Sequence, residues 1–517
     1  MHTCYCSSCN GVEPVSLKKT LKTVCKKIHV SFTRDIKAKS CTTDAESVRA
    51  GDVFFALPDH EDELDEIVGL AIHHGCSAVV ANRPVNGTSS VPFFIVPNVL
   101  EGFAQFCHAL CDYPAKSLKM IAVTGTSGKT STSYLIAGVL AEAGYQVGLI
   151  GSLGIFDGHF LNQTNNADLT PDQLAKWLNI MVMNGCTHVI LEASSKSIAQ
   201  GYLSGINFDA ICMTNIRRDH LDFHGTVEQY RRTKLGIFRY AKKKALAICN
   251  VDDKITGAIL PLIDHPLLSI GIHNQAEVNA TLVERFPNEQ TFLVTAGTTA
   301  VPFCTKIIGD EHIYNCMIAT ALGIGFEIDI KVVARGIERV ESVPARMERI
   351  ECGQPFNVFI DSARTNDSLT AIMKTAKEIT TGKLICVFAA AEYHDPAKRI
   401  QLGKTISSLA NSIILTSASN NLDPKTIAAI CEVGKGFTNS EEVQVMPNRA
   451  EAIAWALSEA ESGDTVLIIG RDETDTYNDN DNDFNRNKKS ENPKSKNFCD
   501  RYFTRQWLYE NQTCMVN

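Results

Sequence analysis

The sequence predicts an α/β protein built from three domains. Its 517 residues suffice for about three domains of ordinary size. Hydrophobic residues make up 44% and charged residues 21%, which is typical of a folded chain with sizeable cores. Short apolar runs of strand length alternate with helical stretches, and this alternation indicates mostly parallel sheets with right-handed crossovers. Ligands of such sheets gather at the carboxyl ends of the strands.

We place the first domain, a small αβ unit, at residues 1–113. Its expected strands fall within 48–56, 77–81 and 93–96, and its expected helices cover 63–74 and 100–111. Cys4, Cys6 and Cys9 are close enough to share a metal ion, but no Cys or His pair follows at the spacing of a zinc finger. We therefore expect a frayed terminus there rather than a metal site.

The second domain, residues 114–343, contains the most informative stretch. An apolar run at 120–123 predicts a buried strand, and a helical pattern follows at 131–143. The residues that lie between this strand and the helix, or begin the helix, are Gly125, Thr126, Ser127, Gly128, Lys129, Thr130 and Ser131. Strand, glycine loop and helix are the context of a phosphate-binding loop, because backbone N–H groups and a helix N-terminus attract phosphate. Lys129 can reach the outer phosphates, and the Thr130 hydroxyl can ligate Mg²⁺.

The full Walker spacing has glycine where Val123 stands, so this loop is a shortened variant of a P-loop. The alternative is an ordinary turn between strand and helix that happens to contain Gly-Lys-Thr. Further strands of the same sheet are predicted at 147–150, 188–193, 208–214 and 245–250, and a helix at 172–183.

The third domain, residues 344–517, is predicted to be a second αβ sheet of Rossmann-like type. Its expected strands are 358–361, 384–389, 413–416 and 466–470, and its expected helices are 368–379, 450–461 and 500–510. Residues 478–496 are rich in Asn, Asp and Lys and predict a disordered linker.

Bulk composition narrows the partners and the location. The formal net charge is −8 and basic residues are dispersed, so we expect no nucleic-acid partner. No apolar run approaches the roughly 18 residues that a membrane span needs, and the N-terminus lacks the apolar core of a secretory signal. We therefore expect a cytoplasmic protein. Its 18 cysteines are then free thiols, many of them small buried hydrophobes.

Polar side chains follow two of the predicted strands of the second domain. Glu192 ends an apolar strand, where its carboxylate could hold Mg²⁺, although the following serines also suit a helix N-cap. After the next strand come Asp219, His220 and Asp222, which could bind a cation or merely form a polar loop. Lys234 follows on a helix and, taken alone, would be a surface lysine.

Two residues near the start of the third domain could contact a nucleotide. Asp361 ends a predicted strand, and Arg346 lies at the expected domain junction. Arginine can hold phosphate through two parallel hydrogen bonds, which lysine cannot do as well. An interdomain salt bridge is an equally good explanation of Arg346.

Several of these stretches resemble the Mur ligase family, with similarity from about Thr42 to Gly470 and a trace at 499–501. Residues 124–130 look like the family's ATP loop, Glu192-Ala-Ser-Ser195 looks like its magnesium motif, and 214–225 is close to its signature. Residues 247–253 and 343–348 also match. The most similar members are those that add the third residue to a UDP-N-acetylmuramoyl peptide.

The resemblance implies an ATP- and Mg²⁺-dependent amide ligase of peptidoglycan precursor synthesis. ATP phosphorylates a substrate carboxylate, and the amine of an amino acid displaces phosphate from the acyl phosphate. The first domain would hold a UDP-type substrate, the second ATP, and the third would complete the ligase. We expect a monomer whose partners are an amino acid and a carboxylate, with no membrane involved.

The resemblance also implies residue roles. Lys129, Lys234 and His220 would be catalytic, and Thr130, Glu192, His220 and Lys234 would serve metal ions, with Lys234 as a carbamate formed with CO₂. The nucleotide would contact residues 125–131 together with Asn315, Arg346 and Asp361. The substrate would contact Thr170, Ser194, Ser195 and Gln200.

Some positions differ from the family pattern. Lys196 stands where the family has histidine, and Tyr202 stands where an arginine contacts the muramoyl peptide. Two alternatives therefore stay open: a divergent ligase that joins other carboxylates and amines, and a non-catalytic ATP-binding scaffold.

Overall fold

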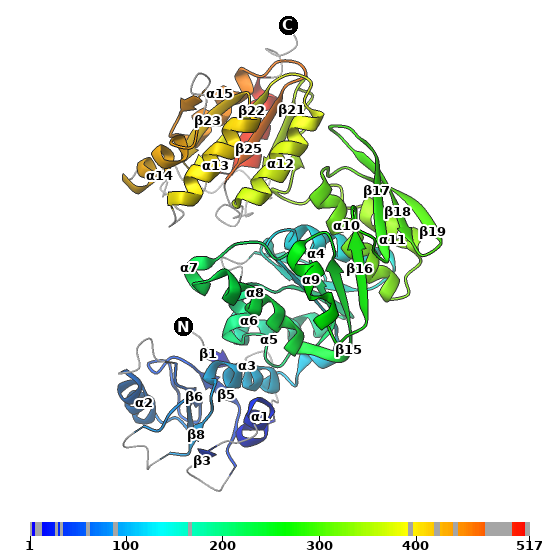
Figure 1. Ribbon diagram of the computed structural model, residues 1–517. Coiled ribbons are helices and arrows are strands. Elements are labelled where there is room, and N and C mark those ends of the chain that lie inside the picture. Colours follow the sequence, from blue (N-terminus) through cyan, green and yellow to red (C-terminus); the bar gives the residue numbers. More distant parts are fainter. Residues whose placement is uncertain are drawn as a thin grey trace, which may run out of the picture.

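In the computed structural model the chain forms three large β-sheets, and Figure 1 shows the central sheet between the other two. The structure describes residues 3–5, 13–25, 29–30, 35–57, 63–85, 91–163, 168–390, 396–417, 424–437, 443–470 and 499–511. The predicted linker 478–496, together with Cys6 and Cys9, lies outside these described residues.

The first unit is a sheet in the order β1-β5-β6-β7-β8-β3, in which β3 is His29–Val30. The predicted strands are confirmed as β6 (Val53–Phe55), β7 (Ala78–Ala81) and β8 (Phe93–Ile95), and the predicted helices as α2 (Leu64–His73) and α3 (Val99–Leu110). Rings on α3 pack against Phe55, with centroids 5.5 Å away for Phe103 and 5.9 Å for Phe106. The prediction of a frayed terminus was wrong for residues 3–5, because β1 (Thr3–Tyr5) pairs antiparallel with β5 (Ser40–Thr42).

The central sheet has the order β12-β11-β10-β13-β9-β14-β15-β16-β17-β18-β19 within the described residues. Its first two strands are β12 (Leu161–Asn162) and β11 (Gly154–Phe156). Its parallel middle consists of β10 (Val147–Gly151), β13 (His188–Glu192), β9 (Lys119–Thr124), β14 (Phe208–Met213), β15 (Ala241–Asn250) and β16 (Leu267–Gly271). The predicted strands of this sheet are thus confirmed.

Helices cover both faces of the central sheet, because its buried strands are apolar on both sides. In β9, Ile121 and Val123 join the core formed with α4 (Lys129–Glu142) and α10 (Asp310–Gly325). Met120 and Ala122 join the opposite core, formed with α5 (Pro171–Met183). Helix α4 begins at Lys129, two residues before the predicted start at 131, so the end of the glycine loop belongs to the helix.

An antiparallel extension of this sheet was not predicted. It consists of β17 (Val278–Arg285), β18 (Gln290–Ala296) and β19 (Thr299–Thr305), which pair in sequence. Only one face of this extension is well buried, so its residues alternate with polar ones and give a weak apolar signal.

The third unit is a sheet in the order β20-β21-β25-β22-β23-β24, with β20 (Glu348–Arg349) and β24 (Val443–Val445) at its two edges. The predicted strands are confirmed as β21 (Asn357–Asp361), β22 (Leu384–Ala390), β23 (Ser412–Ser417) and β25 (Thr465–Ile469). The predicted helices are α12 (Asn366–Ile379), α15 (Arg449–Ser458) and α16 (Asp500–Glu510). Charge pairs hold α16 in place: Arg449 donates to Asp500 at 2.6 Å and Arg501 to Glu348 at 2.8 Å.

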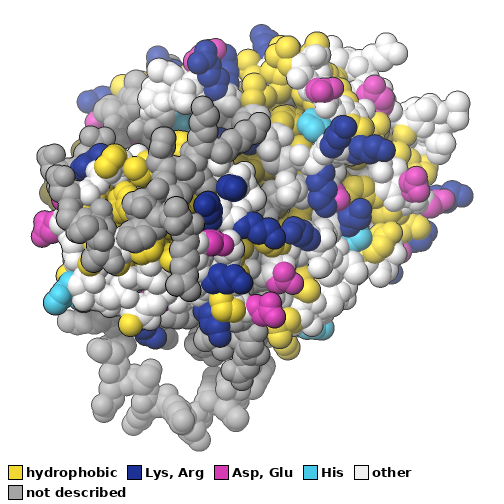
Figure 2. Space-filling view, turned by 90° about the horizontal axis from the view of Figure 1, so that it is seen from below, with side chains coloured by type: hydrophobic (Ala, Val, Ile, Leu, Met, Phe, Trp, Pro, Cys, Tyr) yellow, Lys and Arg dark blue, Asp and Glu magenta, His cyan; other side chains and the backbone are white. Residues whose placement is uncertain are grey.

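The outer surface is mixed in character. Seen from below, Lys and Arg side chains lie across the middle of the molecule with Asp and Glu among them (Figure 2). Among the described residues, no helix is both long and apolar enough to cross a bilayer.

Candidate active site

The predicted phosphate loop joins the carboxyl end of β9 to the N-terminus of α4. Gly125 and Gly128 have φ angles of 151° and 82°, which favour glycine. A Cβ atom at Gly125 would collide with the Thr214 hydroxyl, and one at Gly128 would collide with the Asn315 amide. The loop therefore needs both glycines for its conformation and for the close approach of its neighbours.

Two residues after β14 fix this loop from the side. The Asn215 side-chain oxygen accepts hydrogen bonds from the Ser127 amide at 3.0 Å and the Ser127 hydroxyl at 3.3 Å. The Asn215 carbonyl accepts from the Thr126 amide at 2.9 Å, and Thr214 donates to the Ser127 carbonyl at 2.6 Å. Sequence reasoning did not assign these two roles, although both residues follow a buried strand at the edge where ligands bind.

Lys129 turns back over its own loop. Its Nζ donates to the carbonyls of Gly125 at 3.0 Å and Thr126 at 3.1 Å. Burial lowers the pKa of Lys129, while Glu192 and Asp219 act against that shift. The ammonium thus lies inside the ring of backbone groups where phosphates would bind.

Thr130 and Glu192 meet at the start of α4. The Thr130 hydroxyl lies 3.1 Å from one Glu192 carboxylate oxygen and 2.9 Å from the Ser152 hydroxyl. The Ser152 amide donates to the other carboxylate oxygen at 3.3 Å. Burial raises the pKa of Glu192, although Lys129 and Arg346 lie close enough to oppose the shift. A hydroxyl and a carboxylate beside a phosphate loop fit Mg²⁺, which keeps several waters and takes few protein ligands.

Lys234 is buried, which corrects the expectation of a surface lysine. It lies on α8 (Val227–Leu235) with 1% of its surface exposed. Its Nζ donates to the Gly125 carbonyl at 2.9 Å and to the Thr124 hydroxyl at 3.2 Å, and lies 5.7 Å from the centre of the Tyr230 ring. Burial lowers the pKa of Lys234 well below its usual value, and the nearby Lys129 acts in the same direction. Both effects favour the neutral amine over the ammonium, and Asp219 acts against them.

His220 is not brought into contact with Lys234 or Glu192. It has a left-handed φ of 48°, 60% of its side chain is exposed, and its Nε2 lies 3.4 Å from Asp219. Asp222 is exposed. Among the residues that the structure describes, no group of three or more His, Cys, Asp or Glu side chains could hold a metal ion. Of the predicted metal ligands, the structure brings Thr130 and Glu192 together, and the His220 ring lies apart from them.

Three predicted nucleotide contacts surround the junction with the third unit. Asn315, on α10, accepts a hydrogen bond from the Thr132 hydroxyl at 3.1 Å and lies against Gly128. Arg346 donates to the Ala345 carbonyl at 2.9 Å and to the Ser362 hydroxyl. Asp361 accepts from the amides of Met347 and Ala363, both at 2.7 Å, and burial raises its pKa to about 6.

The backbone around Arg346 is strained. Ala345 and Met347 have φ angles of 47° and 45°, which side-chain-bearing residues rarely adopt. The Glu348 carboxylate holds the Ala345 amide at 3.0 Å, and Asp361 holds the Met347 amide. Strain that surrounding contacts maintain is common at functional sites. The interdomain salt bridge considered for Arg346 is not seen among the described residues, where its guanidinium donates to a carbonyl and a hydroxyl.

The four predicted substrate contacts, Thr170, Ser194, Ser195 and Gln200, form what we call the acceptor set. Thr170 precedes α5 and donates to Asp172 at 2.6 Å, and Ser194 caps α6 (Ser195–Gln200) by accepting from the Ser197 amide at 2.9 Å. Ser195 lies 3.0 Å from His224 Nε2. The Gln200 side-chain oxygen is buried, and no hydrogen-bond partner for it lies among the described residues.

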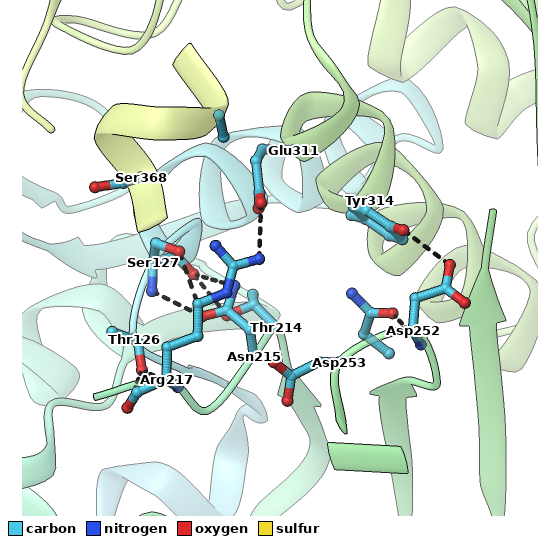
Figure 3. Close-up of polar contacts among 12 residues, drawn as sticks. Thr126, Ser127, Thr214, Asn215, Arg217, Asp252, Asp253, Glu311, Tyr314 and Ser368 are labelled. Carbon is cyan, nitrogen blue, oxygen red and sulfur yellow. Dashed lines mark hydrogen bonds and ion pairs between the residues drawn. The ribbon is translucent and has the colours of Figure 1, made fainter. Parts of the chain in front are cut away.

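Arg217 is a residue that the sequence did not single out. Its amide donates to the Thr126 hydroxyl at 2.9 Å, and its guanidinium donates to Glu311, in the first turn of α10, at 2.8 Å. Figure 3 shows this pair beside Ser127, with Ser368 of the third unit nearby. The only sequence signal was its position two residues after Asn215.

Comparisons with known proteins agree with this geometry. Residues 123–323 match the model of the Mur ligase middle domain, and residues 345–471 match the Mur ligase glutamate ligase domain. The chain is 31% identical over 439 residues to a UDP-N-acetylmuramoyl-L-alanyl-D-glutamate–2,6-diaminopimelate ligase of Geobacillus thermodenitrificans, covering 83% of this chain and 88% of that protein. It is 29% identical over 477 residues to a UDP-N-acetylmuramyl-tripeptide synthetase of Roseiflexus, covering 88% and 93%.

Solved structures share the fold. A UDP-N-acetylmuramoyl-L-alanyl-D-glutamate–2,6-diaminopimelate ligase superposes with a TM-score of 0.66 at 24% identity, covering 90% of this chain and 95% of that one. The MurF ligase of Thermotoga maritima in complex with ADP superposes with a TM-score of 0.57 at 17% identity, covering 83% and 93%.

Proposed function

Because this chain belongs to the Mur ligase family of ATP-dependent ligases, we propose that it adds an amino acid to the carboxylate of a UDP-N-acetylmuramoyl peptide through an acyl phosphate. One observation carries the proposal: three oxygen- and nitrogen-bearing side chains converge on the phosphate loop. Lys129 and Lys234 both donate to the Gly125 carbonyl, and Glu192 lies beside Thr130 at the start of α4.

In the first step, a carboxylate oxygen of the acceptor attacks the γ-phosphorus of ATP and ADP leaves. The reaction needs opposite charge near the phosphoryl oxygens, because charge spreads over them in the transition state. Lys129 and the loop amides supply it from this chain. Mg²⁺ held by Thr130 and Glu192 would neutralise further phosphate charge.

In the second step, the amine of the incoming amino acid attacks the acyl carbon, and inorganic phosphate leaves from the tetrahedral intermediate. The amine loses a proton on the way to the amide. The products are then ADP, phosphate and the extended peptide. The names of the two relatives support this acceptor, since both act on muramoyl peptides by their names. The amino acid added by this chain is not assigned.

We further propose that Lys234 acts as a carbamate. Only a neutral amine adds to CO₂, forming an N-carboxylate and releasing a proton. The lowered pKa and the lack of an acidic partner in its hydrogen bonds favour that neutral form. The carbamate would place an anionic oxygen where the free side chain offers only an amine.

The experiment is a phosphate-release assay with ATP, Mg²⁺, UDP-N-acetylmuramoyl-L-alanyl-D-glutamate and a panel of amino acids. We expect phosphate only when acceptor and one class of amino acid are both present. Tight ATP binding without turnover on any of these mixtures would instead support the scaffold alternative.

A further inference from the structure

The ion pair between Arg217 and Glu311 stands at the rim of the phosphate loop. Arg217 is anchored there by its backbone, because its amide donates to Thr126 of the loop at 2.9 Å. Its side chain extends to Glu311 at 2.8 Å, and the two side chains are 26% and 36% exposed. Figure 3 shows the guanidinium pointing from the loop toward α10. A cation at this rim lies within reach of anions bound to the loop.

The surroundings of Arg217 contain more acid than base. Burial lowers the pKa of Arg217, and Glu311 acts against that effect. Asp367 and Asp253 also raise it, so the net shift is upward. Asp367 lies in the first turn of α12, in the third unit. Carboxylates from two units of the protein therefore act on one guanidinium, which forms its ion pair with Glu311.

A second arginine ties the same two helices farther from the loop. Arg285, on β17, donates to Asp310 of α10 at 2.5 Å and to Glu378 of α12 at 2.7 Å. Its side chain is 8% exposed, and it also donates to Gln290 at 3.0 Å. Arg285 does not contact the phosphate loop. It is the structural tie between the units and supplies a matched control for Arg217.

We propose that Arg217 exchanges Glu311 for a phosphate of the bound nucleotide, and that this exchange couples occupancy of the loop to the position of α12. The inference rests on the proposed function, because it takes ATP to be the ligand of the loop. A guanidinium binds phosphate and carboxylate with the same planar set of donors. This ion pair is partly open to solvent, which weakens it, so a bound triphosphate can compete for the arginine.

The exchange has a consequence for the third unit. When Arg217 turns to the nucleotide, Glu311 loses its ion-pair partner and Asp367 loses a nearby cation, so the two carboxylates repel each other more strongly. The first turn of α12 then moves away from α10, while Arg285 still holds the last turn. Arg217 is thus a positioning residue that links nucleotide binding to domain arrangement.

The test measures binding of a non-hydrolysable ATP analogue to the full chain with Mg²⁺, by calorimetry. For Arg217→Gln we expect a Kd about tenfold higher, because one charge-assisted contact to phosphate is lost. For Glu311→Gln we expect a Kd about threefold lower, because Arg217 no longer has to leave a carboxylate. Arg285→Gln should leave the Kd within about twofold. Opposite shifts for the two partners are the signature, since a purely structural ion pair would weaken binding in both variants.

Hydrogen exchange gives the second readout. In the unaltered protein, the analogue should speed exchange in residues 366–379, and Arg217→Gln should abolish that response. Arg217→Lys, which keeps the charge, should retain part of it. Shifts of Kd in the same direction for Arg217→Gln and Glu311→Gln would overturn the inference. Absence of analogue binding to the unaltered protein would instead overturn the proposed function.

Discussion

The phosphate loop and the acceptor set lie on the same sheet edge, yet they are built differently. Groups of the loop and of α4 are hydrogen-bonded to residues from three other places in the fold: Asn215 follows β14, Lys234 comes from α8, and Asn315 comes from α10. In the acceptor set, Thr170 and Ser194 cap the N-termini of α5 and α6. The Gln200 side-chain oxygen is buried, with no hydrogen-bond partner among the described residues. One region is preorganised for its ligand and the other is completed by it.

This difference teaches which part of the molecule can change independently. A loop whose groups position one another loses its geometry when one group is removed. Side chains that each serve a local helix end can be exchanged without disturbing ATP binding. The departures at Lys196 and Tyr202 fall beside the acceptor set, whereas the loop keeps its glycines, lysine and hydroxyls. Substitutions in the two regions should therefore have separable effects.

The largest effect is expected from Lys234→Ala. Loss of the group that would provide the anionic carbamate oxygen should lower kcat by about a thousandfold or more, as for other removed electrostatic contacts at transferring groups. A short carboxylic acid added to the assay should restore part of the rate. Activity equal to that of the unaltered protein would rule out the carbamate role.

Next comes Glu192→Gln, which keeps the shape and removes the charge. We expect kcat to fall by about a hundredfold, because phosphate charge is less well neutralised. The Mg²⁺ concentration for half-maximal rate should rise, which a magnesium titration at fixed ATP measures. The expected ATP affinity without Mg²⁺ stays close to the original value, and a large loss there would place Glu192 in nucleotide binding instead.

Gln200→Leu addresses the acceptor set. If the buried Gln200 oxygen accepts a hydrogen bond from the acceptor, its loss should raise the KM for the acceptor about tenfold. The KM for ATP should not change. Steady-state kinetics with each substrate varied in turn separates these outcomes, and a rise in the KM for ATP alone would contradict the division between the two regions.

The smallest effect on turnover is expected from His108→Leu, outside both regions. His108 is fully buried on α3 with both ring nitrogens unpartnered among the described residues, and burial lowers its pKa to about 4. The unfolded chain protonates this imidazole near pH 6.5, so the native state loses stability as pH falls below 6.5 and has lost the full amount by about pH 4.

The leucine variant should thus gain up to about 2 kcal/mol relative to the original protein on going from pH 8 to pH 5. Urea unfolding at the two pH values measures the difference. His312, whose pKa burial lowers to about 3, remains in the variant, so part of the acid sensitivity persists. A pH-independent change in stability would show that His108 is not held neutral.

Local signals explain how much of this could be predicted. The phosphate loop was identifiable because glycine, lysine and hydroxyl groups stand between a strand of four fully buried residues, Met120 to Val123, and a helix. The strands of the parallel sheets were identifiable as apolar runs. The meander of β17 to β19 was not, because its exposed face breaks the apolar pattern.

Tertiary contacts explain what could not be predicted. The helix that carries Lys234 is polar in sequence, and the contacts of this lysine with the Gly125 carbonyl and the Thr124 hydroxyl, far away in sequence, appear only in the fold. Conversely, His220 stands among residues that suit metal binding, but its left-handed backbone leaves its ring largely in solvent. Residue type indicates what a side chain can do, whereas packing decides where it lies.

The central claim is that a carboxylate is activated by the γ-phosphate held at this loop. Its most direct test is a turnover experiment with the acceptor carboxylate labelled with ¹⁸O, followed by ³¹P NMR of the released phosphate. An acyl phosphate requires one labelled oxygen to pass from the carboxylate to each inorganic phosphate. Phosphate that carries no label while amide is formed would contradict the account.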